Sequence, residues 1–341
     1  MPIAMDLRYD FESTSDYAGS FSASEFTSVK TNRLLNLYEH GRYACPSANS
    51  GSTDLASRYQ GVVADRYGLP NDEAEQLREG IKHRLYLDHI LKGHHFFAPI
   101  GDGPQKIVDL GTGTGIWAME VAEKFPSARV IGTDISAIQP SWTPPNLEYR
   151  VEDLEDDYRP WTSIYNDADL VHCRFFMQVI RDPKRMVDTI FDRLRPGGWI
   201  ECHDIVAEVY SKDASVGKDH PINQLYHLID GPFTEVYKWN LHIVLELPSL
   251  LREAGFVNVS TRRNKIPIGR WPSEHSEREM GLFQQTIILD FALAVLARHD
   301  ILGLDQDEAA ELGQQVVDCV HDPGMHAYMD WADVWAQKPV T

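Results

Sequence analysis

The stretch KIVDLGTGTGIW, from Lys106 to Trp117, constrains the fold of this chain more than any other part of the sequence. Ile107 and Val108 are apolar and β-branched and Leu110 ends the run, which predicts a buried strand, and the glycines that follow predict a tight turn. A helix is expected to begin at Ile116 and to end near Lys124. The unpaired backbone N–H groups at such a helix start favour an anionic group of a ligand.

The spacing of the glycines separates this turn from the common dinucleotide fingerprint. Gly111, Gly113 and Gly115 follow the pattern GxGxG, whereas the fingerprint GxGxxG needs its third glycine one position later, where Ile116 stands. Residues without side chains let a ligand approach the backbone closely. A glycine can also serve the turn conformation alone, so the turn does not by itself define a ligand.

Two further strands are expected to end in acidic residues. The segment 128–134 reads as a second strand that closes on Asp134, and the apolar segment 147–151 leads into Asp153. An aspartate at the end of such a strand can accept hydrogen bonds from both hydroxyl groups of a ribose. This arrangement predicts a nucleoside-binding site at the carboxyl ends of the strands.

The order and spacing of these residues resemble class I S-adenosylmethionine-dependent methyltransferases, and other segments resemble the LaeA-like methyltransferases of fungal secondary metabolism. These segments are Tyr38–Tyr43, Pro70–Arg78, Ile135–Asn146, Arg195–Glu201, Leu251–Phe256, Ile266–Pro272 and Val334–Pro339. The resemblance covers the chain from about Leu34 onward. It implies an α/β fold, with a Rossmann-like seven-stranded sheet, helices on both faces, an N-terminal helical cap and helical insertions.

The resemblance also implies S-adenosylmethionine as the cofactor. Asp109 would bind its ammonium group, Asp134 its ribose and Ile135 one face of its adenine. Asp153 would accept the adenine amine, and Leu154 would offer a backbone N–H to the ring. The full predicted cofactor set is Tyr43, Asp109, Gly111, Thr112, Gly113, Gly115, Trp117, Asp134, Ile135, Asp153, Leu154 and Arg174.

Methyl transfer from a sulfonium needs alignment and exclusion of water, and it requires no metal. A hydroxyl or carboxyl acceptor gains from a base that takes its proton, and imidazole titrates in the useful range. His203 and His172 are expected near strand ends, with His242 as a third candidate. Each histidine is equally consistent with a packed, hydrogen-bonded role. Strand alternation places Glu201 on the same side as His203.

An excess of acidic residues limits which molecules this protein is expected to bind. The 341 residues include 51 aspartates and glutamates against 32 lysines and arginines, which gives a net charge of −19. Nucleic-acid affinity rests largely on neutralising phosphates, so a nucleic acid is not expected as a partner. The four cysteines show no CxxC spacing, which predicts neither a zinc site nor a disulfide framework.

The sequence favours a protein that works inside the cell and away from membranes. The N-terminus lacks the basic and apolar regions of a signal peptide, and no apolar run approaches the length that is expected of a membrane span. We expect a cytoplasmic protein, or a nuclear one if its role is regulatory.

Five regions are predicted along the chain. They are a flexible arm at 1–33, a helical cap at 34–100, the cofactor-binding core at 101–206, a substrate-side insertion at 207–255, and strands and helices at 256–341 that complete the sheet. Aromatic residues in the arm offer contacts for a second copy or another protein. The last strand, Tyr328–Lys338, is expected at the sheet edge.

A long helix is expected from Asp72 to about Gly93. Asp72 would cap it, and Glu75 stands where a capping box would place it. Leu77, Ile81 and Leu85 recur at four-residue steps and predict one apolar stripe.

Three functions agree with these patterns. The first is methylation of a small-molecule secondary metabolite, with an oxygen atom favoured as the acceptor. The second is a regulator that resembles LaeA and acts through protein partners. The third is a methyltransferase fold recruited to a reaction without methyl transfer, such as a cyclisation.

Overall fold

The computed structural model describes residues 67–158 and 161–341, which belong to one folded unit. The predicted arm at 1–33, the first part of the cap and Tyr43 lie outside the described residues. The regions that the sequence separates at 206 and 255 share one sheet.

Seven strands form this sheet in the order β3-β2-β1-β4-β5-β7-β6. They are β1 (Lys106–Leu110), β2 (Arg129–Asp134), β3 (Leu147–Val151), β4 (Ala168–Arg174), β5 (Leu194–Ser211), β6 (Val257–Pro267) and β7 (Ala327–Gln337). The pairs from β3 to β5 are parallel, while β7 runs antiparallel to both of its neighbours. The predicted Rossmann-like sheet is confirmed.

The position of the last strand differs from the prediction. β7 lies between β5 and β6, so the sheet edge is formed by β6 and not by the end of the chain. Side chains from both faces of β7 are buried, including Trp331 and Val334. A strand that is paired on both sides satisfies its backbone on both edges, which an edge strand cannot do.

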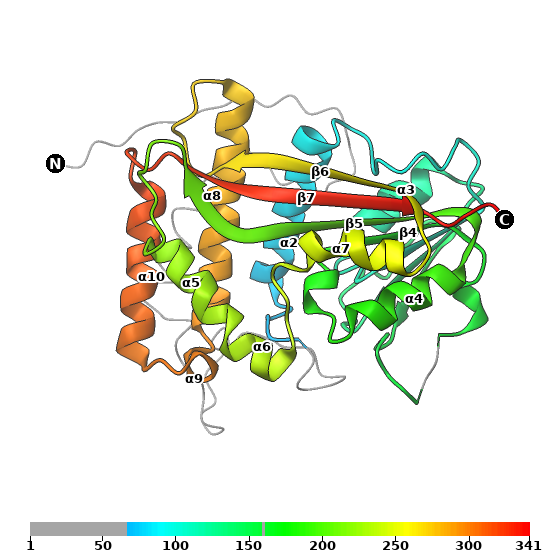
Figure 1. The fold of residues 1–341 in the computed structure, drawn as a ribbon, viewed down its shortest axis with the longest axis horizontal. Helices are drawn as coiled ribbons and strands as arrows, with labels where there is room; N and C mark the ends of the chain where they lie inside the picture. The colour runs from blue at the N-terminus through cyan, green and yellow to red at the C-terminus, as the bar shows by residue number, and fades with distance from the viewer. Residues whose placement is uncertain (1–66, 159–160) are drawn as a thin grey trace. The chain divides into compact units, whose positions relative to one another are not determined.

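β5 is longer than expected. It pairs with β7 from Trp199 to Ser211, so the predicted boundary at 206 falls inside a strand. The long strands β5, β6 and β7 extend away from the parallel part of the sheet toward a group of helices (Figure 1). This group contains α5 (Pro221–Asp230), α8 (His275–Leu296) and α10 (Gln306–His321).

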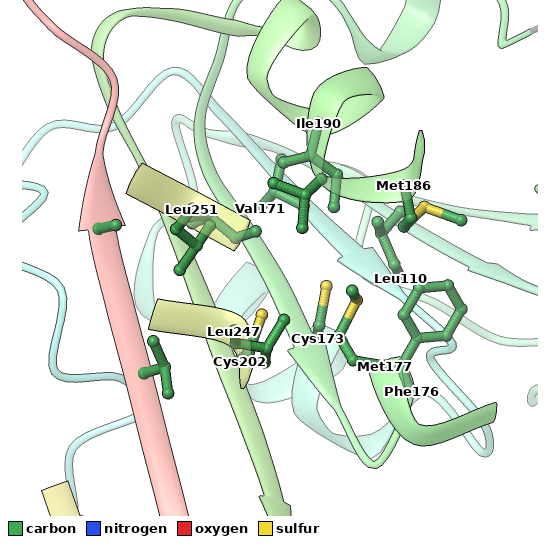
Figure 2. Packing of buried hydrophobic residues seen from close by; sticks show 14 of the residues in the cluster. Leu110, Val171, Cys173, Phe176, Met177, Met186, Ile190, Cys202, Leu247 and Leu251 are labelled. Atoms are coloured by element: carbon green, nitrogen blue, oxygen red, sulfur yellow. The ribbon is translucent and has the colours of Figure 1, made fainter. Parts of the chain in front are cut away.

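Apolar side chains alternate along the parallel strands and build one core on each face of the sheet. Ile107 packs with α3 (Ile116–Lys124), whereas its neighbour Val108 packs with α4 (Pro183–Arg193) and α7 (Ile243–Glu253). Figure 2 shows the second of these cores, where side chains from α4 and α7 meet those of β1, β4 and β5. Helices on both faces bury the strands, as a parallel sheet requires.

The predicted long helix is present as α2 (Glu73–Leu85), which continues into the π-helix η1 (Tyr86–Ile90). Asp72 caps α2 by accepting from the Glu75 backbone N–H at 3.0 Å. The predicted capping box is wrong, because the Glu75 carboxylate pairs with Arg78 instead of returning to the backbone N–H of Asp72. α2 packs mainly against α8.

α8 is long and apolar enough to cross a membrane by length and composition, a feature that the sequence analysis missed. It is the one such helix among residues 67–158 and 161–341. Most of its apolar window, 61%, is buried, and it packs against α2 and α10. The core helix of a globular unit accounts for this pattern. The remaining short elements are η2 (Ser163–Tyr165), η3 (Met177–Val179), α6 (Pro232–Tyr237) and α9 (His299–Leu302).

Candidate cofactor and substrate site

The three glycines of the turn after β1 all have positive φ, at +68°, +56° and +79°, but their surroundings differ. A Cβ on Gly115 would lie 2.1 Å from the Tyr149 hydroxyl, and one on Gly111 would lie 2.6 Å from the Phe176 ring. A Cβ on Gly113 would meet nothing within 4 Å. Gly113 is therefore the glycine above which space is open, while Gly115 serves packing.

A cavity with a volume of about 190 Å³ lies at the carboxyl ends of the parallel strands. Seven of the predicted cofactor residues line it, and they come from the ends of β1, β2, β3 and β4. They are Gly111, Gly113, Asp134, Ile135, Asp153, Leu154 and Arg174. Ligands of open α/β sheets bind at this edge, so the observed placement agrees with the general rule.

Asp134 holds the loop that surrounds it. Its carboxylate accepts from the backbone N–H groups of Gly113 and Ser136, both at 2.8 Å. Burial raises the pKa of Asp134 to about 6, although these two hydrogen bonds oppose the shift. Each carboxylate oxygen retains a second lone pair for a ribose hydroxyl.

Replacing Asp134 with alanine is expected to weaken S-adenosylmethionine binding by roughly 1.5–3 kcal/mol, because an acceptor of charge-assisted hydrogen bonds is lost. Titration calorimetry measures the change. Asp188→Ala, which removes an exposed acid on α4, is the control and should leave the affinity unchanged. For the wild type, the affinity should fall as the pH drops through about 6, since Asp134 then gains a proton. Equal affinities of Asp134→Ala and wild type would contradict the ribose contact.

Four other predicted cofactor residues do not line the cavity. Asp109 accepts from the Thr112 hydroxyl at 2.6 Å and contacts His172 Nδ1 at 2.7 Å. Its carboxylate therefore connects the glycine turn to β4. Burial raises its pKa to about 6. Trp117 is buried, and its indole N–H donates to the His95 carbonyl at 2.9 Å. Thr112 and Gly115 likewise serve the turn itself.

None of the three predicted histidines lines the cavity. His172 stacks on Trp117 with ring centroids 3.7 Å apart, and burial holds its pKa well below the ordinary value. His242 contacts Asp230 at 3.2 Å on a half-exposed part of the surface. Their role as bases stays a prediction that this geometry does not favour.

His203 lies between two buried carboxylates. Its Nδ1 is 2.8 Å from Asp333 Oδ1, and its Nε2 is 2.9 Å from Glu201 Oε1. Burial lowers its pKa, but the hydrogen bonds that the ring donates to both carboxylates outweigh this effect and raise the pKa to about 9. Glu201 shares a side with His203, as strand alternation predicted. A ring with both nitrogens facing carboxylates is poorly placed to accept a proton from a substrate.

Sequence reasoning missed the charged residues of α2 that line the cavity. Glu75, Arg78, Glu79 and Lys82 are spaced at three and four residues, which places them on one helix face. Arg78 pairs with both glutamates, and Lys82 Nζ lies 2.5 Å from Glu79. Burial lowers the pKa of Lys82 to about 8. Their spacing was visible beside the apolar stripe, but a charge pattern of this kind usually marks a solvated face.

The residues that line the cavity match the chemical groups of S-adenosylmethionine. Gly113 leaves open space above the turn, Asp134 offers acceptor oxygens, and Ile135 and Leu154 offer apolar contact. Arg174 provides a partner for the carboxylate of the amino-acid end. When bound, the cofactor supplies a methyl group on a positively charged sulfur, which a nucleophile can attack directly.

The fold and this site define a class I S-adenosylmethionine-dependent methyltransferase. A methyltransferase domain pattern matches residues 81–261. The chain is 32% identical to methyltransferase pytC of Aspergillus terreus over 319 residues, which covers 93% of this chain and 92% of that protein. The chain belongs to this methyltransferase family, and its cofactor is S-adenosylmethionine.

Other relatives are similar at lower levels. The secondary metabolism regulator LAE1 of Cochliobolus heterostrophus is 30% identical over 69% of this chain and 77% of its own length. Among solved structures, the chain is similar to phosphoethanolamine N-methyltransferase 2 of Haemonchus contortus in complex with S-adenosyl-L-methionine. That similarity has a TM-score of 0.39 at 14% identity, and it covers 94% of this chain and 61% of the other.

Proposed function

We propose that this methyltransferase transfers the methyl group to an oxygen atom of a small-molecule secondary metabolite. The observation that carries the proposal is that one cavity joins the strand-end residues Gly113 and Asp134 to aromatic residues such as Trp239 and Phe291. A largely apolar wall suits a small organic acceptor better than a charged polymer. The net charge of −19 supports the same choice.

The named relatives support a role for this reaction in secondary metabolism. Methyltransferase pytC matches along nearly the whole chain, and a probable methyltransferase, tdiE of Emericella nidulans, is 29% identical over 78% of it. These fungal relatives support a role in the biosynthesis of a fungal metabolite. We propose the cytoplasm as the place where the protein acts, or the nucleus if its role is regulatory.

The experiment uses S-adenosylmethionine labelled in its methyl group and a low-molecular-weight extract of a producing fungus. We expect the label to move into a small molecule, with one S-adenosylhomocysteine formed per methyl transferred. The NMR shift of the labelled carbon then tells whether oxygen, nitrogen or carbon was methylated. Label found on nitrogen or carbon would overturn the choice of acceptor atom.

A regulatory role is the second candidate, because LAE1 is named a secondary metabolism regulator. In that case the label should stay with protein, or a protein partner should be retained without turnover of metabolites. A cofactor-bound cyclase would instead convert substrate without forming S-adenosylhomocysteine. The labelling experiment detects methyl transfer to protein, whereas a pull-down detects a retained partner and product analysis detects a cyclisation.

A further inference from the structure

A second group of cavity residues comes from the helices and the long strands instead of the ends of the parallel strands. Tyr226 of α5, Phe291 of α8 and Met329 of β7 belong to it, as does Leu241 before α7. These side chains are apolar or aromatic. They form the part of the cavity that the cofactor residues do not account for.

Four cavity residues carry a buried polar atom without a hydrogen-bond partner among the described residues. These are Gln178 Oε1, Gln284 Oε1, Trp239 Nε1 and Trp331 Nε1, and we call the four residues the amide–indole wall. Gln284, Trp239 and Trp331 are 1%, 2% and 0% exposed. Buried polar atoms are normally paired, because an unpaired one keeps its desolvation cost. A ligand that pairs with them would remove this cost.

Two adjacent residues connect the amide–indole wall to the glycine turn. Phe176 packs over Gly111, and Phe175 packs edge-on against Trp331 with ring centroids 5.3 Å apart. Phe175 has a φ of +54°, a conformation that a bulky residue rarely adopts. The strained backbone at Phe175 is thus stabilised by its surroundings. The wall is placed next to the turn that binds the methyl donor.

The chemistry of the wall specifies the ligand. Two indole N–H groups need acceptors on the ligand, and two amide oxygens need donors. The charged residues of α2 that approach this region are paired among themselves, and Arg78 lies 5.6 Å from the centre of the Phe291 ring. The α2 residues therefore offer a charged ligand no free counter-charge. Tyr226 and Phe291, with centroids 5.8 Å apart, offer flat apolar surfaces.

We propose that the amide–indole wall binds the methyl acceptor, and that this acceptor is an uncharged aromatic compound carrying both a hydroxyl and a carbonyl group. The proposal rests on the small-molecule function proposed above and names its substrate class. Gln284 accepts from the hydroxyl, and Trp331 donates to the carbonyl. Both are specificity-determining residues.

Calorimetry with three coumarins tests the proposal in the full-length protein saturated with S-adenosylhomocysteine. 7-Hydroxycoumarin, at a slightly acidic pH that keeps its phenol protonated, carries both groups. Coumarin lacks the hydroxyl, and coumarin-3-carboxylate adds a charge. We expect affinity to fall about tenfold from 7-hydroxycoumarin to coumarin, since one hydrogen bond is lost, and we expect the carboxylate not to bind.

Variants assign the two hydrogen bonds. Gln284→Leu should weaken 7-hydroxycoumarin about tenfold and leave coumarin unchanged, whereas Trp331→Phe should weaken both probes because both carry the carbonyl. Gln315→Leu, at an exposed position on α10, and Trp142→Phe, at an exposed indole, are the matched controls. Neither control should change any affinity.

Stability provides a second measurement. Gln284 bonds only weakly, to Met329 Sδ at 3.3 Å, so Gln284→Leu or Gln284→Met should unfold at the same temperature as the wild type or higher. Equal binding of 7-hydroxycoumarin by wild type and both Gln284 variants overturns the proposal, as does absence of binding by the wild type. Loss of S-adenosylhomocysteine binding in the wild type would instead overturn the cofactor site, so the two failures are distinguishable.

Discussion

Gly113→Ala is expected to fold like the wild type but to bind S-adenosylmethionine on the order of a hundredfold more weakly, equivalent to about 2.7 kcal/mol. The added methyl group meets no protein atom within 4 Å, so it stands in the space above the turn that the ligand needs. The left-handed backbone adds strain of about 1–2 kcal/mol, which lowers stability moderately. Calorimetry and thermal unfolding measure the two effects separately.

Gly115→Ala should mainly lower the stability of the fold, whereas Gly113→Ala mainly lowers the affinity for the cofactor. Its methyl group would collide with Tyr149, whose hydroxyl donates to the Gly115 carbonyl at 2.9 Å. We expect the free energy of unfolding to fall by about 3 kcal/mol from backbone strain, collision and the lost hydrogen bond together. Gly303→Ala, with φ of +71° and nothing within 4 Å, is the control for strain alone. If Gly113→Ala and Gly303→Ala bound the cofactor equally well, the open space above Gly113 would not be the donor site.

Asp333→Ala is expected to lower the free energy of unfolding by about 3–5 kcal/mol, since it breaks a buried ion pair and removes an acceptor that three side chains share. Besides His203, Asp333 accepts from the Tyr86 hydroxyl at 3.2 Å and from Asn264 Nδ2 at 2.7 Å. On the other side of His203, Glu201 accepts from the backbone N–H groups of Phe97 and Ala98. The network therefore connects η1, β5, β6, β7 and the segment before β1.

Denaturant unfolding measures this loss, and Asp330→Ala is the control on the same strand. Asp330 is less buried, and its carboxylate accepts from the Tyr210 hydroxyl at 2.6 Å, so its removal should cost less. Similar losses for the two variants would contradict a special contribution of the His203 network.

The same network predicts a pH dependence of stability. The pKa of His203 is about 9 in the folded protein, against roughly 6.5 in an unfolded chain. Folding thus favours the protonated ring, and this contribution is fully present below about pH 6.5 and lost as the pH rises through about 9. Asp333→Asn should flatten this part of the curve. A wild-type curve parallel to that of Asp333→Asn between these pH values would contradict the assignment.

The glycine motif was readable from sequence because its determinants are local. The helix Ile116–Lys124 follows from the turn, and Asp134 ends β2 as expected. The strand at Leu147–Val151 was also predicted with its observed bounds. Each depends on residues within a few positions of the chain, where periodicity and turn chemistry act.

The histidines show where such reasoning fails. His203 looked like a base because it stands near a strand end, yet the residue that pairs with it, Asp333, is 130 positions later in the sequence. The strand that carries Asp333 was expected at the edge and lies instead between β5 and β6. Its placement decides which groups surround His203. No local pattern contains that information.

The sequence by itself determined the fold class, the glycine turn and the acids at the strand ends, because these features depend on backbone conformation and on near neighbours. Only the tertiary structure decided which glycine leaves open space, which histidines are enclosed by carboxylates, and that Gln284 and Trp331 share one cavity with Asp134. Burial and pairing of side chains depend on elements brought together from distant parts of the chain. These contacts decide whether a polar group is left for a ligand or is satisfied by the protein itself.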